Sequence, residues 1–465
     1  MGTDPKAAGV APALADVLVP AANAWALVRA GQSLDRALET VLEPRAIGAV
    51  ADPARLGGAV RDLASSTVRR WALVEAILSD LLHRPPDPAV HALLAVALTQ
   101  LLVRSYSDFT LVDQAVRAAR AQPRTAGAAG LVNAILREFV RRREPLEQQA
   151  RADPARRCNV PPWWLQRVQA QYGGARAEAM LTAQAQEPPL VLRVNVRQTD
   201  VARVLAQFAE KAMAASQVGP QAVWLHQALP VERIPGFLQG AVSVQDAGAQ
   251  LAAPWLGVAD GMHVLDACAA PGGKTAHVLE LADCRLDAVE ISPVRAQRIE
   301  ANVKRLGLPA GNLRIFVADV LQTDTYWSGE QYHRILLDAP CTASGVVRRH
   351  PDVVLLRQEG DVANLATQQA KMLRALWPLL APAGRLLYVV CSVFAEEGRR
   401  QVRAFVQRQP GARLLALPVG APDGVQLLPT PVAGAGLQRE DWADRGDGAM
   451  PTLHDGFFYA LLEKN

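Results

Sequence analysis

The architecture of this chain is set by Val264-Leu-Asp-Ala-Cys-Ala-Ala-Pro-Gly-Gly-Lys-Thr275. An apolar strand leads through a turn of small residues into a helix. Gly272 and Gly273 allow a ligand to approach the backbone closely. The amides of the turn and of the helix N-terminus favour an anionic group, here a carboxylate. The turn has neither GxGxxG nor GxxxxGK[ST] spacing, which argues against dinucleotides and nucleoside triphosphates as ligands.

From about residue 241 onward, strand-like and helix-like patterns alternate. Such alternation is typical of a mostly parallel, doubly wound sheet, so we expect an α/β, Rossmann-like domain over residues 241–465. The expected strands are His263–Leu265, Leu286–Ile291, Leu313–Val317, Ile335–Leu337 and Leu386–Val390, and the expected helices include Val294–Leu306 and Val362–Leu380. We expect Phe457–Leu462 to be an edge strand, and the Gly/Pro-rich stretch from Val419 to Met450 to be a long loop.

The first 145 residues predict an all-helical domain, because few strand-like alternations interrupt their helical spacing. Asp87 and Pro88 resemble an N-cap followed by proline at the first helical position, and Thr110 with Asp113 fits a capping box. The expected helices are Leu14–Ala30, Ala89–Val103, Ala115–Ala121 and Leu131–Arg143.

A polar stretch, Pro145–Arg157, suits a linker between this domain and a smaller one. The region 155–240 predicts a short α+β module. Its expected elements are helices Trp163–Ala170 and Asp200–Ala209 and strands Leu190–Val196 and Ala222–Leu225.

Composition places few limits on the partners of the chain. The 465 residues include 49 basic and 45 acidic side chains, a net charge of +4 that permits a nucleic-acid partner without requiring one. The five cysteines lack metal-ligand spacing, and their odd number argues against a disulfide scaffold. With no signal peptide and no long apolar span, we expect a soluble, cytoplasmic protein. The cysteines are Cys158, Cys268, Cys284, Cys341 and Cys391.

Acidic residues mark the ends of three expected strands. Glu290 ends the strand after the glycine turn, where a carboxylate can bind the two ribose hydroxyls of an adenosine ligand. Asp319 ends the third strand and could face the adenine amino group, and Asp338 ends the fourth. One acidic strand end is often only a solvated cap, but three at one sheet edge predict a ligand crevice.

Two cysteines follow the ends of adjacent strands, in Asp338-Ala-Pro-Cys341 and in Cys391-Ser392. A single cysteine is usually an inert core residue, but both of these emerge where ligands bind. A thiolate that adds to carbon 6 of a cytosine makes carbon 5 nucleophilic enough to take a methyl group. One cysteine would then be the nucleophile and the other would assist elimination, while Asp338 would hydrogen-bond the ring N3 or the exocyclic amine.

Several long motifs, in order, resemble the Sun/Nop family of RNA cytosine-5 methyltransferases. They are Val244-Gln-Asp-Ala-Gly-Ala-Gln250, the glycine turn, Asp338-Ala-Pro-Cys-Thr-Ala-Ser-Gly345, Arg348-Arg-His-Pro-Asp352, Val390-Cys-Ser392 with Glu396-Glu397, and Asp455-Gly-Phe-Phe-Tyr459. The resemblance covers the C-terminal half of the chain and implies S-adenosylmethionine as cofactor.

The resemblance also implies a separate catalytic role for each of the two cysteines. Cys391 corresponds to the nucleophile of the family, and Cys341 to the residue that helps release the product. The family usually has Asp where Glu290 stands and often Thr where Val390 stands. By the same carry-over, the cofactor contacts would be Cys268, Ala269, Ala270, Pro271, Gly272, Gly273, Lys274, Glu290, Asp319 and Asp338.

The N-terminal region resembles NusB RNA-binding domains. Phe109-Thr-Leu-Val-Asp-Gln-Ala-Val116 and Gly130-Leu-Val-Asn-Ala-Ile-Leu-Arg137 carry this similarity. The order of NusB-like domain, α+β module and methyltransferase resembles the Sun/RsmB-type members of the family, which implies 16S rRNA as partner and cytosine 967 as target. The alternatives are another rRNA position, a tRNA, or a non-catalytic RNA-binding assembly factor.

We expect a monomer that binds neither DNA nor a membrane. Candidate phosphate contacts are Arg141–Arg143 and Arg348–Arg349, although a charge run is more often a solvated face. Trp163 and Trp164 could stack on a base, but burial in the small module is the simpler expectation.

Overall fold

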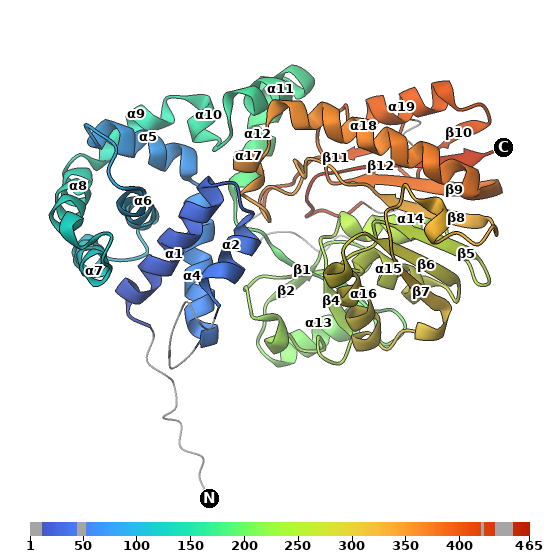
Figure 1. The fold of residues 1–465 in the computed structure, drawn as a ribbon. Coiled ribbons are helices and arrows are strands. Elements are labelled where there is room, and N and C mark those ends of the chain that lie inside the picture. Colours follow the sequence, from blue (N-terminus) through green and yellow to red (C-terminus); the bar gives the residue numbers. More distant parts are fainter. Residues whose placement is uncertain (1–11, 44–52, 420–422, 433–449) are drawn as a thin grey trace, which may run out of the picture. The chain divides into compact units, whose positions relative to one another are not determined.

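The computed structural model describes residues 12–43, 53–419, 423–432 and 450–465. The chain forms two compact units (Figure 1). The first is Met1–Gln166 with His350–Gln358, and the second is Arg167–Arg349 with Glu359–Asn465. Among the described residues, none of the helices is both long and apolar enough to span a membrane.

The first unit is helical, as expected. Helix α6 is buried on nearly all sides and packs against α1, α4, α5, α7 and α8. The helices are α1 Leu14–Arg29, α2 Leu34–Val41, α4 Pro53–Val68, α5 Trp71–Leu81, α6 Pro88–Val103, α7 Asp108–Ala121, α8 Ala129–Arg141, α9 Arg143–Arg151, α10 Pro154–Arg157 and α17 Val353–Leu356. Asp87 caps α6 by accepting a hydrogen bond from Ala89 N at 2.8 Å, which confirms the predicted start.

Two expectations for this unit are wrong. Helix α7 begins earlier than predicted, because Ser107 Oγ rather than Thr110 accepts the capping hydrogen bond. The expected linker Pro145–Arg157 is largely helical, in α9 and α10. Leu146 and Ala150, four residues apart, give α9 an apolar face that is buried in the helical core.

A short segment from the C-terminal half of the sequence belongs to the helical unit. Leu355 of α17 packs against the helical core, and Asp352 Oδ2 accepts a hydrogen bond from Leu34 N at 2.9 Å. Leu34 N is one of the unsatisfied amides at the start of α2. The segment that follows Arg349 therefore supplies a hydrogen-bond acceptor to the N-terminus of α2, more than three hundred residues earlier in the chain.

The second unit starts with a small antiparallel sheet of order β2-β3-β1-β4. Its strands are β1 Leu190–Val194, β2 Ala215–Gln217, β3 Ala222–Leu225 and β4 Val242–Val244, with helix α13 Val201–Glu210 packed on one face. Helix α11 Pro162–Tyr172 and the unpredicted α12 Gly174–Ala185 precede it. This confirms the expected α+β module.

An eight-stranded sheet follows, in the order β10-β12-β9-β8-β5-β6-β7, with β11 paired to β12. Strands β9, β8, β5, β6 and β7 are parallel, as predicted. The strands are β5 His263–Ala267, β6 Arg285–Glu290, β7 Leu313–Val317, β8 Tyr332–Asp338, β9 Leu380–Val390, β10 Ala412–Leu415, β11 Val425–Leu427 and β12 Phe457–Lys464.

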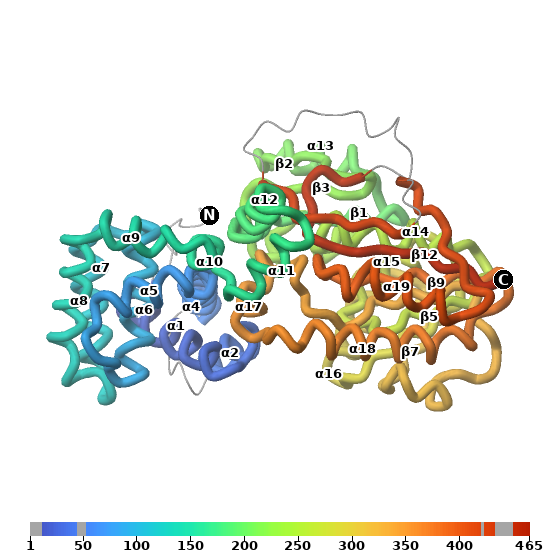
Figure 2. Tube along the Cα trace, turned by 90° about the horizontal axis from the view of Figure 1, so that it is seen from above, coloured from blue at the N-terminus to red at the C-terminus, as the bar shows by residue number. Residues whose placement is uncertain are grey.

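Helices cover both faces of this sheet (Figures 1 and 2). Residues of α14 Ala252–Leu256, α15 Gly273–Leu281 and α16 Pro293–Arg305 share one core with the sheet. Residues of α18 Glu359–Leu376 and α19 Arg399–Arg408 share the other. The doubly wound, Rossmann-like class is confirmed.

The C-terminal run is not the edge strand that we expected. Strand β12 pairs antiparallel with β9 on one side and with β10 on the other, and it is buried along nearly its whole length. Its apolar residues are therefore covered on both faces. The expected loop 419–450 contains β11, so this prediction is wrong for Val425–Leu427, while residues 420–422 and 433–449 lie outside the described part.

Candidate active site

The glycine turn connects β5 to α15 and lies close to α16. Gly272 precedes α15 with φ of 95°, and a Cβ at this position would come within 2.9 Å of Ile299 Cα. Only glycine combines this conformation with such close packing. The next residue but one, Lys274, reaches across to β8, where its Nζ lies 2.5 Å from Asp338 Oδ2. The turn is thereby tied to the strand that leads to Cys341.

Arg193 of β1 contacts both the glycine turn and the helix α15 that follows it. The sequence analysis assigned this residue no role. Its guanidinium makes a bidentate ion pair with Glu280 of α15, at 2.6 and 3.0 Å, and donates to Gly273 O at 2.6 Å. Both side chains are almost completely buried. An arginine at a buried strand position was the available signal, because such a residue needs a partner.

The strand-end carboxylates lie where the parallel pairing places them. Glu290 ends β6, is buried, and accepts hydrogen bonds from Ala270 N at 3.3 Å and Ser292 N at 3.0 Å. Asp319 lies two residues beyond β7, and its Oδ1 accepts from Leu321 N at 2.9 Å. Asp338 is the last residue of β8. The predicted acidic residues thus follow three strands of one sheet edge.

The residues at this edge fit an adenosine-type cofactor that carries an amino-acid group. Asp266, the strand residue before the turn, is buried, and its Oδ1 has no hydrogen-bond partner in the described part of the chain. Such an atom suits an ammonium group. Ile291, Val294 and Val317 are exposed apolar side chains beside Glu290 and Asp319, and they offer contact surface for a base.

Cys341 and Cys391 lie side by side at the ends of β8 and β9. Their Sγ atoms are 3.3 Å apart. Cys341 is buried, and the neighbouring Cys391 sulfur together with burial raises the pKa of the Cys341 thiol well above its usual range. Cys391 is half-buried and so more accessible to a substrate. Cys341 therefore keeps its proton, and the Cys391 sulfur is the more exposed of the two.

Lys274 adds a positive charge next to this pair. Burial alone would lower the pKa of Lys274, but the Asp338 carboxylate more than offsets this effect, and a negative charge on Cys391 acts in the same direction. The pKa of Lys274 is therefore raised, and the side chain stays an ammonium. A fixed cation of this kind stabilises a thiolate.

A buried carboxylate, Glu397, holds the two cysteine segments together. Its Oε1 accepts from Thr342 N at 2.8 Å and from Gln369 Nε2 at 3.1 Å. Its Oε2 accepts from the hydroxyls of Thr342 and Ser392, both at 2.5 Å. Thr342 and Ser392 each follow one of the cysteines directly. The sequence reading had Glu397 only as part of a motif, without a role.

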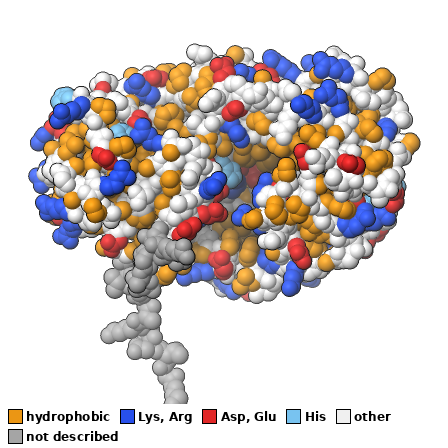
Figure 3. Space-filling view, viewed as in Figure 1, with side chains coloured by type: hydrophobic (Ala, Val, Ile, Leu, Met, Phe, Trp, Pro, Cys, Tyr) orange, Lys and Arg blue, Asp and Glu red, His pale blue; other side chains and the backbone are white. Residues whose placement is uncertain are grey.

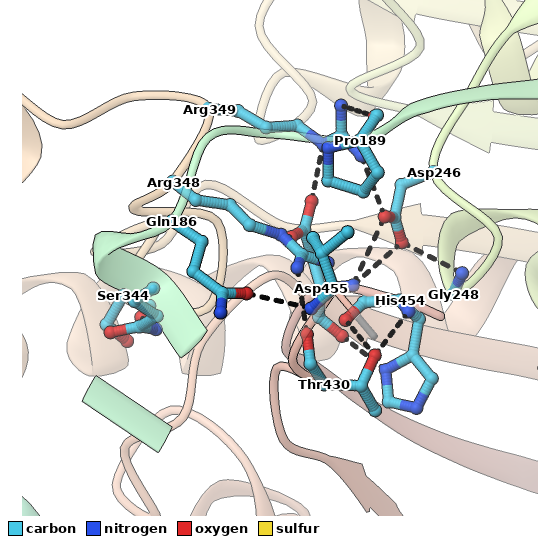
Figure 4. Close-up of polar contacts among 12 residues, drawn as sticks. Gln186, Pro189, Asp246, Gly248, Ser344, Arg348, Arg349, Thr430, His454 and Asp455 are labelled. Atoms are coloured by element: carbon cyan, nitrogen blue, oxygen red, sulfur yellow. Dashed lines mark hydrogen bonds and ion pairs between the residues drawn. The ribbon is translucent and has the colours of Figure 1, made fainter. Parts of the chain in front are cut away.

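The phosphate contact expected of Arg348 is wrong because its side chain has no exposed surface, whereas Arg349 stays partly exposed and its contact remains a prediction (Figure 4). Arg348 is fully buried and ion-paired with Asp455. Arg349 pairs with the same carboxylate and, at 3.0 Å, with Asp246. These charges connect three of the sequence motifs. Next to these ion pairs, Gly456 packs directly against Gly345. A Cβ on Gly345 would collide with the Gly456 backbone.

The other candidate RNA contacts are on the helical side. Arg141 and Arg142 pair with Glu138, and Arg143 lies 2.6 Å from Asp108. Of the two tryptophans, Trp164 is completely buried, which confirms the simpler expectation for it.

The doubly wound sheet, the glycine turn, the buried Asp266 with one carboxylate oxygen free among the described residues and the pair of sulfurs together define the class: this is an S-adenosylmethionine-dependent RNA methyltransferase. Comparison with family models agrees. The model "16S rRNA methyltransferase RsmB/F" matches residues 253–463, a ferredoxin-like domain of RsmF/B-like methyltransferases matches 160–232, and the NusB family matches 25–141.

The chain belongs to the ribosomal RNA small subunit methyltransferase B family. It is 38% identical to the member from Pseudomonas putida over 92% of this chain and 97% of that protein. It is also 38% identical to the member from Xanthomonas campestris, over 100% of this chain and 99% of that one. The expected cofactor and the resemblance to cytosine-5 enzymes are thereby confirmed.

Solved structures share the fold. PH0851 aligns with a TM-score of 0.73 at 23% identity, covering 97% of this chain and 99% of its own. NSun6 from Pyrococcus horikoshii, solved with SFG, aligns with a TM-score of 0.55 at 18% identity, over 65% of this chain and 98% of its own.

Proposed function

We propose that the chain methylates carbon 5 of cytosine 967 in 16S rRNA through a covalent adduct with Cys391. The observation that carries the proposal is the pair of sulfurs 3.3 Å apart, one accessible and one buried with a raised pKa. The names of the relatives, ribosomal RNA small subunit methyltransferase B, support the small-subunit RNA as substrate.

In the proposed reaction the Cys391 thiolate forms a bond to carbon 6 of the ring. The electron pair that this addition displaces makes carbon 5 nucleophilic, and carbon 5 gains the methyl group. S-adenosylmethionine, when bound, would supply that group as an electrophilic methyl, with its methyl–sulfur bond breaking and S-adenosylhomocysteine leaving. A base then removes the carbon-5 proton, the bond between sulfur and carbon 6 breaks, and its electron pair returns to Cys391.

Three side chains assist these steps. The buried Cys341 thiol donates a hydrogen bond to the departing Cys391 sulfur and so stabilises the returning negative charge. Lys274 stabilises the same charge through its ammonium group. Asp338, whose Oδ2 binds Lys274, accepts a hydrogen bond from the cytosine through its Oδ1. The base must leave its stack to reach this site.

The cofactor residues belong to the same proposal. The turn from Cys268 to Lys274 would receive the amino-acid end, Glu290 the ribose and Asp319 the adenine. Support comes from the hydrogen bond that Ala270 N donates to Glu290. It links the turn to the carboxylate that we propose for binding the ribose. We also propose domain bounds of 1–145, 155–240 and 241–465, inside which the three family matches fall.

A denaturing gel of the protein incubated with 16S rRNA and S-adenosylmethionine tests the mechanism. Cys341→Ala should accumulate a protein–RNA adduct that survives denaturation, because product release is impaired, whereas Cys391→Ala should form none. Cys158→Ala, at the end of α10, is the matched control and should behave as the wild type does. Mass spectrometry of the digested RNA should place the methyl group on cytosine 967.

Two results would contradict the proposal. An adduct in Cys391→Ala would reverse the two cysteine assignments. Methylation of tRNA or of another rRNA position, with 16S cytosine 967 unmodified, would overturn the substrate while leaving the chemistry in place.

A further inference from the structure

The positive charge of this chain is concentrated in one segment of the helical unit. Residues 107–143, which span α7 and α8, contain seven arginines against three acidic residues, a net charge of +4. The whole chain also carries +4, so the other residues together are neutral. Figure 3 shows Lys and Arg side chains along the edge of this unit where Figure 1 places α7 and α8. Such a patch attracts a polyanion.

A groove lies within this segment, between α7 and α8. Its volume is about 470 Å³, within the range of roughly 300–1,000 Å³ that is usual for ligand sites. Val112, Val116 and Val140 form its apolar lining. Phe109 is one of the lining residues and is 79% exposed, so most of its ring is open to a ligand.

The acidic residues of the groove are already neutralised. Asp108 pairs with Arg143 at 2.6 Å, and Asp113 pairs with Arg117 at 2.9 Å. Three arginines line the groove. Arg141 pairs with Glu138, whereas no described carboxylate lies within ion-pair distance of Arg120 or of Arg137, whose Nε donates to Asn133 Oδ1 at 3.0 Å. The groove therefore presents two unneutralised guanidinium groups beside an exposed aromatic ring.

We propose that this groove binds a single-stranded segment of the RNA substrate, with one base stacked on Phe109 and adjoining phosphates paired with Arg120 and Arg137. The proposal rests on the proposed function, in that RNA is the substrate. An aromatic ring beside arginines is the combination that holds unpaired nucleotides, since every base has a face to stack.

Binding of a fluorescein-labelled poly(U) oligonucleotide to the full chain, followed by anisotropy, tests this site. Phe109→Ala should weaken binding by about 5- to 150-fold, the usual contribution of one stacked base. Phe109→Trp keeps an aromatic face and should bind as the wild type does. Because Phe109 is so exposed, its truncation should leave the thermal unfolding temperature unchanged, which separates lost binding from lost folding.

The arginines are tested by salt dependence. In Arg120→Ala/Arg137→Ala, the slope of log affinity against log salt should become shallower by about 1.4, or ~0.7 per lost phosphate contact on a single strand. Arg61→Ala on α4, where an exposed arginine pairs with Asp35, is the matched control and should keep the wild-type slope. Affinity within twofold of the wild type in both groove variants would overturn the proposal.

Methylation of 16S rRNA, measured on the same variants, separates the two proposals. If the wild type methylates 16S rRNA and the groove variants keep its KM and its poly(U) affinity, the groove assignment fails and the function stands. If the wild type leaves 16S rRNA unmethylated, the proposed function fails, and the poly(U) result alone decides whether the groove binds RNA.

Discussion

At the scale of single residues, the two cysteine segments are held by a buried carboxylate between them. Glu397 receives four hydrogen bonds, from the residues that follow the two cysteines and from Gln369, which also donates to Pro340 O at 2.9 Å. The main chain on both sides of Cys341 is therefore held by this one carboxylate and its partner. We interpret Glu397 as a positioning residue for the two sulfurs.

Glu397→Ala should lower kcat by about 100-fold, since a displacement of about 1 Å in a reacting group can cost that much. The KM for RNA should change little, because Glu397 is buried away from substrate. Glu397→Gln should retain most of the activity, because the hydroxyls of Thr342 and Ser392 can accept from its amide. The rate of adduct formation in a Cys341→Ala background is the measurement. Equal loss in both variants would contradict a positioning role.

Asp266 gives the protein a pH dependence of stability. Burial raises its pKa to about 7, whereas the unfolded chain releases this proton near pH 4. The folded state therefore holds a proton that the unfolded state has lost, and this stabilising contribution is complete below about pH 4 and disappears as the pH rises through 7. The slope is at most about 1.4 kcal/mol per pH unit.

Thermal unfolding of the cofactor-free protein between pH 5 and 8 measures this effect. The unfolding temperature of the wild type should fall with rising pH more steeply than that of Asp266→Asn, which cannot titrate. Parallel curves for the two proteins would show that Asp266 is ionised throughout.

At the scale of elements, the small module supports the cofactor turn through Arg193. Arg193→Met should destabilise the second unit by about 3–5 kcal/mol, because it leaves the buried Glu280 charge without a partner. It should also weaken binding of S-adenosylmethionine, since Gly273 O loses its donor. Thermal unfolding and calorimetric titration measure the two effects.

The double variant Arg193→Met/Glu280→Met is the informative control. It should recover much of the lost stability, because two apolar side chains replace the buried pair, but not the cofactor affinity. Arg203→Met, at an exposed position of α13, should change neither quantity. Full recovery of cofactor binding in the double variant would show that Arg193 does not support the turn.

At the scale of the whole chain, residues 350–358 lie within the methyltransferase part of the sequence but belong to the helical unit of the structure. The charged hydrogen bond from Leu34 N to the buried Asp352 carboxylate should contribute about 1.5–3 kcal/mol. Asp352→Ala should therefore speed hydrogen exchange at the start of α2 and lower the stability of the helical unit. Asp352→Asn keeps a hydrogen-bond acceptor and should lose less stability than Asp352→Ala. Unchanged exchange at Leu34 would contradict this contact.

Local pattern was sufficient for much of the fold and of the candidate site. Strands β5 to β9 are short apolar runs between helical stretches, and their parallel order brings Glu290, Asp338, Cys341 and Cys391 to one sheet edge whatever the loops do. Asp87 predicted the start of α6 because a helix cap is a contact between near neighbours.

Only the tertiary structure decided which charges face solvent and which are buried. The sequence suggested phosphate contacts for Arg348 and Arg349 and no role for Arg193, yet each of the three pairs with a carboxylate from a distant segment. The place of β12 inside the sheet, and of Asp352 at the start of α2, likewise depends on partners far along the chain. Sequence spacing encodes neighbours within a few residues, whereas these contacts form only when the chain has folded.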